Sequence, residues 1–250
     1  MDTALFSPSS LFACSDGSSS EEEEDVHQSF EERRHHFPGM ELLIREFSFH
    51  QLNANLLWPG SLNFAEWLVQ NKSWVEGRRI IELGSGTGAL AIFLQKSFQI
   101  LNITTSDYDD QEIEDNIAHN CRVNGVVPVL PHIKHSWGDP FPCSDPDWDL
   151  VIASDILLYV KQYDNLIKTL SFLLNCYKIK GNKESSRSSE NDMDTQQLRP
   201  VFLMSWRRRI GKEDESLFFH GCKNAGLEVE HLGSRVYCIT PGEIIIEEAA

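Results

Sequence analysis

One short stretch in the first half of the chain constrains the fold more than any other. Residues 80–83 are apolar except for one acid, Glu82. Three glycines follow at alternate positions, Gly84, Gly86 and Gly88. Glycine suits places where the backbone turns sharply or passes close to a ligand, because a Cβ would collide there. The stretch predicts a strand, a tight turn and a helix, with a ligand at the turn, where open α/β sheets bind them.

The spacing of the glycines separates two kinds of cofactor site. The dinucleotide-binding fingerprint is G-x-G-x-x-G, whereas this chain has G-x-G-x-G. The glycines alone also leave open a plain structural turn or a nucleotide loop. A second acid, Asp107, follows the next expected strand and can accept charge-assisted hydrogen bonds from ribose hydroxyls. The alternative for Asp107 is a helix cap, a position that Asp favours.

Expected strands and helices alternate along the chain. We expect strands at about 78–84, 100–106, 126–134, 148–154, 201–206 and 227–240, and helices at about 61–72, 88–98, 109–124, 160–176 and 212–225. This alternation predicts a mostly parallel sheet with right-handed crossovers. Pro128 and Pro131 place the third strand at an edge. Residues 41–51 predict an extended pairing segment, and Ser61 is the expected cap of the first helix.

The chain divides into a tail and one domain. Residues 1–36 are rich in serine and acids and have too little apolar surface to fold, so we expect a disordered tail. The tail is either dispensable or functional. Residues 37–250 form the expected domain, and residues 181–199 form a polar, flexible insertion within it.

Charge and cysteine usage limit the partners. The net charge of −16 argues against a nucleic-acid partner but allows a basic protein. No apolar run approaches the ~20 residues of a membrane span. Six cysteines have neither C-x-x-C nor zinc spacing, which predicts no metal site and reduced thiols in an intracellular protein. We expect a cytoplasmic location, with a nuclear one as an addition.

Five motifs together carry a resemblance to a known family. They are Leu-Trp58-Pro-Gly, Glu82-Leu-Gly-Ser-Gly-Thr-Gly88, Ser106-Asp107, Ser136-Trp137-Gly138 and Asp155-Ile-Leu-Leu-Tyr159. Over about residues 40–240, the chain resembles the class I, seven-strand methyltransferases that use S-adenosylmethionine (SAM). More narrowly, it resembles the family that methylates lysines of non-histone proteins. In the fifth motif, Tyr159 stands one position later than the family's aromatic residue, and Leu158 takes the expected place.

The resemblance implies a Rossmann-like three-layer α/β/α fold and a set of site residues. The cofactor-binding residues are Trp58, Glu82, Gly84, Ser85, Gly86, Gly88, Asp107, Trp137 and Ser154, and the catalytic residues are Asp155 and Tyr159. We expect Glu82 to organise the glycine loop and Asp155 to orient an amine. The alternatives are a helix cap for Asp155 and core packing for Trp58 and Trp137.

The function that follows from the resemblance is SAM-dependent methyl transfer to a lysine side chain of a protein, such as a translation factor or a chaperone. We expect a monomer. A small-molecule amine N-methyltransferase and an inactive SAM-binding adaptor remain as alternatives. A nucleic-acid amino-methyltransferase would carry Asn/Asp-Pro-Pro-Tyr/Phe, and this chain has Asp155-Ile-Leu-Leu instead. The turn at residues 207–209 is either solvated or in contact with an acidic substrate.

Overall fold

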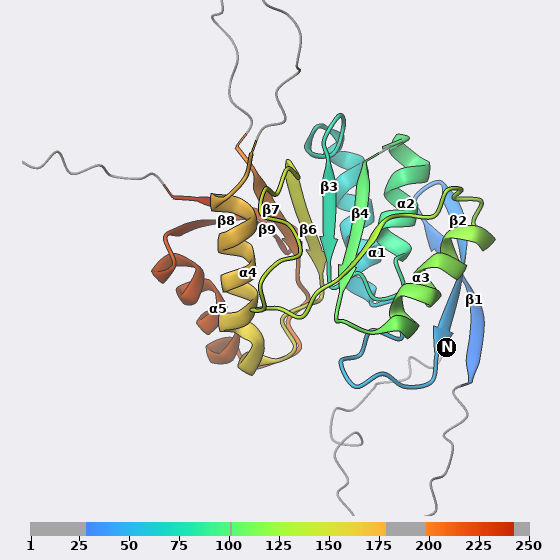
Figure 1. Cartoon of the computed structure of the whole chain (residues 1–250), viewed down its shortest axis with the longest axis horizontal. Helices are drawn as coiled ribbons and strands as arrows, with labels where there is room; N and C mark the ends of the chain where they lie inside the picture. The colour runs from blue at the N-terminus through green and yellow to red at the C-terminus, as the bar shows by residue number, and fades with distance from the viewer. Residues whose placement is uncertain (1–28, 101, 179–198, 243–250) are drawn as a thin grey trace, which may run out of the picture.

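The computed structural model describes residues 29–100, 102–178 and 199–242 (Figure 1). The strands are β1 (Phe30–Phe37), β2 (Met40–Phe47), β3 (Ile80–Leu83), β4 (Ile103–Asp107), β5 (His132–Lys134), β6 (Leu150–Ser154), β7 (Val201–Ser205), β8 (Leu227–Gly233) and β9 (Val236–Pro241). The α-helices are α1 (Pro59–Gln70), α2 (Ala89–Phe98), α3 (Gln111–Val123), α4 (Tyr163–Asn175) and α5 (Lys212–Asn224). Two 3-10 turns, η2 (Lys72–Trp74) and η3 (Val160–Gln162), complete the list. None of these helices is long and apolar enough to span a bilayer.

The main sheet has seven strands in the order β5-β4-β3-β6-β7-β9-β8. The pairs β3–β4, β3–β6, β4–β5 and β6–β7 are parallel, and only β9 runs antiparallel to its neighbours β7 and β8. The predicted, mostly parallel seven-stranded sheet is therefore confirmed. The chain winds outward from β3 to β5 and then returns to β6 on the other side of β3. Ligands of open α/β sheets bind at such a reversal, outside the carboxyl ends of the strands.

Helices cover both faces of this sheet, with α1, α2 and α3 on one side and α4 and α5 on the other (Figure 1). Neighbouring residues of a strand point to opposite faces. Ile80 accordingly packs in the core shared with Phe64 and Phe93, whereas Ile81 packs in the core shared with Leu170 and Phe218. The three-layer α/β/α arrangement predicted from the resemblance is confirmed.

The prediction of a disordered tail through residue 36 is wrong for residues 30–36, which form most of β1. All eight residues of β1 pair with β2 in an antiparallel hairpin. Most β1 side chains are exposed, so the strand has no apolar period that its sequence could reveal. Arg33 and His35 each reach the buried Glu46 at 3.3 Å. Residues 1–28 of the predicted tail and 181–198 of the predicted insertion lie outside the described residues.

Asparagine side chains of α3 fix the hairpin to the domain. The amide of Asn124 accepts from the Leu43 N–H at 3.0 Å and donates to the Leu43 carbonyl at 2.7 Å. The amide of Asn120 likewise accepts from the Arg45 N–H at 2.7 Å and donates to the Arg45 carbonyl. These side-chain amides bond to main-chain N–H and C=O groups at the edge of β2, much as a neighbouring strand would. They position the start of the following loop, residues 48–58, which borders the cavity described below.

The first helix begins earlier than the sequence predicted. Its N-cap is Trp58 and its first residue is Pro59, a residue whose fixed φ suits that position. Ser61 is therefore not a cap. Its buried hydroxyl lies 2.8 Å from the hydroxyl of Ser154 and ties α1 to the end of β6.

Candidate functional site

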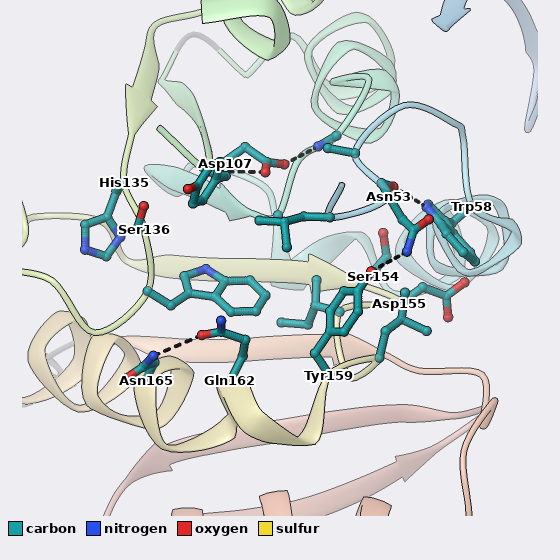
Figure 2. Close-up of a pocket in the computed structure, with 18 of the residues that line it drawn as sticks. Asn53, Trp58, Asp107, His135, Ser136, Ser154, Asp155, Tyr159, Gln162 and Asn165 are labelled. Atoms are coloured by element: carbon teal, nitrogen blue, oxygen red, sulfur yellow. Dashed lines mark hydrogen bonds between the residues drawn. The ribbon is translucent and has the colours of Figure 1, made fainter. Parts of the chain in front are cut away.

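A cavity of about 410 Å3 lies at the carboxyl ends of β3, β4 and β6. This volume falls in the range of small-molecule sites, about 300–1,000 Å3. Most of the predicted site residues line it, namely Trp58, Gly84, Gly86, Asp107, Trp137, Ser154, Asp155 and Tyr159. Figure 2 shows Asp107 on one side and Tyr159 on the other, with His135 and Ser136 at one end and Asn53 and Trp58 at the opposite end. We call the end of the cavity that contains Asn53 and Trp58 the Trp58 end.

The glycine turn brings main chain to the cavity wall. Gly84 and Gly86 have φ values of 61° and 52°, in the left-handed region that side chains disfavour. A Cβ on Gly84 would lie 2.8 Å from Cγ2 of Ile156, which also lines the cavity. The N–H of Gly86 donates to the Asp107 carboxylate at 2.6 Å, so the turn and the end of β4 are held together.

Three predicted cofactor residues support the turn and do not line the cavity. The carboxyl group of Glu82 accepts from the Ala91 N–H at the start of α2 at 3.2 Å, and burial raises its pKa to about 8. The Ser85 hydroxyl donates to the Ser106 carbonyl at 3.2 Å. A Cβ on Gly88 would lie 3.0 Å from Cγ2 of Ile117 on α3. Glu82 thus joins the end of β3 to the first turn of α2, and Gly88 allows α2 and α3 to pack.

Asp107 presents a buried carboxylate to the cavity. One of its oxygens accepts from Gly86, and the other accepts from the N–H of Tyr108 at 2.7 Å. Burial raises the pKa of this carboxyl, and the two N–H groups act in the opposite direction. Each oxygen keeps acceptor capacity, because a carboxylate offers about four lone-pair sites. The geometry therefore allows the Asp107 carboxylate to accept hydrogen bonds from hydroxyl groups of a ligand.

The loop at residues 48–58 closes the Trp58 end through Asn53. The Asn53 carbonyl accepts from the Trp58 indole N–H at 2.9 Å, and its side-chain amide donates to the Tyr159 hydroxyl. Asn53 has a positive φ of 58°, a region in which asparagine is enriched among non-glycine residues. His50 holds the same loop, because its Nδ1 accepts from the N–H groups of Leu52 and Ala54. Burial raises the pKa of Tyr159, so its phenol stays protonated at neutral pH.

The structure corrects the expectation for Asp155. The residue borders the cavity, but its side chain is 0% exposed. Its carboxylate accepts from the N–H of Gly60 at 2.8 Å, from the N–H of Arg207 at 3.1 Å and from the Arg209 guanidinium at 2.7 Å. Because its side chain is fully buried and its charge is paired with Arg209, the carboxylate does not face an incoming amine. The cap alternative is correct in kind, although the helix that Asp155 caps is α1 and not the helix that follows it.

Several lining residues carried no signal in the sequence. Asn53, Gln162 and Asn165 come from a loop, a 3-10 turn and a helix, with no motif in common. His135, for which no role was expected, lines the cavity, and its ring lies tilted against Phe141 at 4.6 Å between ring centroids. Tyr159 and Leu158, the two candidates for the aromatic position of the fifth motif, both line the cavity.

The residues around this cavity fit SAM. The buried Asp107 carboxylate can accept hydrogen bonds from ribose hydroxyls, and it lies beside Gly84 and Gly86, whose positive φ values favour glycine. Trp137 supplies an aromatic surface, and the Trp58 ring at the Trp58 end could attract a sulfonium by a cation–π interaction. Within the described residues, no group of His, Cys, Asp and Glu could hold a metal ion.

Solved structures share this fold. The 16S rRNA N2 G1207 methyltransferase RsmC of T. thermophilus, determined with AdoMet and guanosine, aligns with a TM-score of 0.56 and 13% identity. The alignment covers 86% of this chain and 51% of that one. A methyltransferase from Methanococcus maripaludis aligns with a TM-score of 0.53 and 14% identity, over 78% of this chain and 90% of that one.

Curated relatives include lysine methyltransferases. The chain is 29% identical over 144 residues to the protein N-terminal and lysine N-methyltransferase EFM7 of Cryptococcus neoformans, covering 53% of this chain and 47% of that protein. It is 29% identical over 147 residues to the EEF1A lysine methyltransferase 3 of Xenopus tropicalis, covering 57% and 63%. The chain thus spans about half the length of the first relative. A family model described as lysine methyltransferase matches residues 37–198, and the chain belongs to this lysine methyltransferase family.

Proposed function

We propose that this protein transfers a methyl group from SAM to the side-chain nitrogen of a lysine in a non-histone protein. Membership of the lysine methyltransferase family supports this activity. The observation that carries it is the single cavity that joins the glycine turn and Asp107 to the Trp58 end. Such a cavity has one region for a nucleoside and another where an acceptor can approach.

The residues around the cavity bind and orient, and none of them needs to act as a nucleophile. SAM, when bound, supplies a methyl group that is already electrophilic. Gly84 and Gly86 allow the ligand to approach the main chain, and the Asp107 carboxylate accepts hydrogen bonds from its hydroxyl groups. The rate enhancement then comes mainly from orientation, which can supply roughly 7–11 kcal/mol.

The Trp58 end favours an uncharged amine over an ammonium ion. Its polar groups include the amide of Asn53 and the phenol of Tyr159, both neutral, whereas the carboxylate of Asp155 is bonded to Arg209. Lysine has a pKa of about 10.4 in water, and burial lowers it. Loss of the amine proton to water during burial therefore fits this end of the cavity better than proton transfer to a side chain.

The acceptor and the cellular setting are part of the proposal. A translation factor is the favoured class of acceptor, since one relative is named for EEF1A. We expect the protein to act as a cytoplasmic monomer. The net charge of −16 favours a basic protein surface as the acceptor and disfavours nucleic acid.

Calorimetric titration tests the cofactor, and transfer of label tests the acceptor. The purified chain should bind SAM and S-adenosylhomocysteine, and Gly86→Arg should lose both, because Gly86 lines the cavity with a φ of 52°, where a bulky side chain is strained. A normally folded Gly86→Arg variant with unchanged affinity would contradict the cofactor site. Purified elongation factor 1A should then acquire label from SAM on a lysine. Label found on small amines only would favour a metabolite methyltransferase, and binding without any transfer would favour an adaptor.

A further inference from the structure

Arg209 lies at the Trp58 end although it follows β7, far along the chain. Its guanidinium carbon lies 4.6 Å from the centroid of the Trp58 ring, and its side chain is 27% exposed. The same guanidinium donates to the Asp155 carboxylate at 2.7 Å. β6 and β7 pair in parallel up to Ser154 and Ser205, and the Asp155 N–H donates to the Ser205 carbonyl at 3.0 Å. This pairing brings the chain after β7 beside the residue that ends β6.

Among the residues that the structure describes, Arg209 is the only cation that donates to the Asp155 carboxylate. The other two are the main-chain N–H groups of Gly60 and Arg207. A buried carboxylate without a paired charge is unfavourable, so Arg209 balances a charge that the fold cannot expose to water. Arg208 in the same turn pairs instead with Glu215 on α5. Adjacent arginines therefore serve different partners.

We propose that Arg209 is a positioning residue for methyl transfer: it holds the Trp58 ring from outside the cavity and offsets the negative charge of Asp155 next to the bound cofactor. The proposal rests on the proposed function, because it assigns the Trp58 end to the charged sulfur of SAM and to the acceptor. It adds a residue outside the five motifs and makes the electrostatic balance of the cavity depend on one ion pair.

The pair of ligands SAM and S-adenosylhomocysteine reports this balance. SAM carries a positive sulfonium, whereas S-adenosylhomocysteine carries a neutral thioether in the same framework. The variant Arg209→Gln leaves the Asp155 carboxylate without its cation, which favours binding of SAM, with its positive sulfonium, over S-adenosylhomocysteine. The variant Asp155→Asn leaves the Arg209 guanidinium without its anion, which favours binding of S-adenosylhomocysteine, with its neutral thioether, over SAM. We expect the ratio of the two dissociation constants to move by at least about fivefold in opposite directions, since nearby charges interact strongly in partly buried sites.

The experiment measures both dissociation constants by calorimetry for the full chain, the two single variants and the double variant. The double variant should restore the wild-type ratio, because neither charge remains. Arg208→Gln is the matched control, since it removes a cation from the same turn without touching Asp155. Thermal unfolding of each variant identifies any that fail to fold. If Asp155→Asn fails to fold, the Arg209→Gln and Arg208→Gln comparison still decides the question.

Arg209→Lys separates charge from stacking. Lysine keeps the positive charge but lacks the flat guanidinium that lies over the indole. The ligand ratio should therefore stay at the wild-type value, whereas the fluorescence of Trp58, obtained by subtracting the spectrum of the same chain with Trp58→Phe, should change. Equal ligand ratios in Arg209→Gln, Arg208→Gln and the wild type would overturn the proposal. Failure of the wild type to bind either ligand would instead overturn the proposed function.

Discussion

Gly60→Ala tests the contacts that hold the start of α1 against the end of β6. Gly60 is the second residue of α1, and its N–H donates to the Asp155 carboxylate at 2.8 Å. A Cβ at this position would lie 2.5 Å from the Asp155 carboxyl carbon and 2.6 Å from both oxygens. The carboxylate cannot simply move aside, because Arg207 and Arg209 also hold it. The added methyl group must therefore separate Gly60 from Asp155 or break the other two bonds.

The expected magnitude follows from the bonds at stake. A hydrogen bond to a charged group contributes about 1.5–3 kcal/mol, and displacing the carboxylate also weakens its pairing with Arg209. Alanine is a better helix former than glycine, which returns up to about 1 kcal/mol. We expect a net loss of about 2 kcal/mol, or a fall in Tm of about 4–8 °C for a chain of this size.

The assay is urea unfolding followed by circular dichroism, with thermal unfolding as a second measure. The matched control makes the same Gly60→Ala change in an Asp155→Gly background, where the carboxyl group is absent and glycine suits the φ of 54°. There the change should be neutral or stabilising. Equal losses of unfolding free energy in both backgrounds would refute the argument, because the clash with Asp155 would not be the cause.

Three further predictions test other parts of the fold and the site. Burial raises the pKa of Glu82 from 4.5 to about 8, so between these pH values the folded state keeps a proton that the unfolded chain releases, and the unfolding free energy should fall as pH rises. Urea unfolding of Glu82→Gln should show a shallower fall, and a pH dependence identical to that of the wild type would contradict this. A chain that starts at residue 38 should melt below one that starts at residue 29, because it lacks β1; equal Tm values would mean that the hairpin adds no stability. Asn53→Ala and Tyr159→Phe should be non-additive by about 1 kcal/mol in unfolding free energy, since they share one hydrogen bond; strict additivity in the double-mutant cycle would argue that the bond contributes nothing.

The sequence by itself determined the side of the cavity that the glycine turn and Asp107 form. The apolar residues before Gly84 form β3, the glycines form the turn, and Asp107 ends the neighbouring strand as expected. These features are local, because positive φ values favour glycine and buried strands require continuous apolar residues. Parallel pairing of β3 and β4 then places Asp107 beside the turn without any further information.

Only the tertiary structure decided the Trp58 end and the first strand. The Asp155 carboxylate bonds to Arg209, 54 positions away, and Tyr159 bonds to Asn53, 106 positions away. β1 is held by main-chain pairing and by contacts to Glu46, with little apolar burial of its own. Contacts of this kind leave no period or spacing in the sequence, because each depends on how strands and loops from separate parts of the chain come together. A carboxylate at a strand end was therefore visible in the sequence, but whether it faces a substrate or an arginine was settled only by packing.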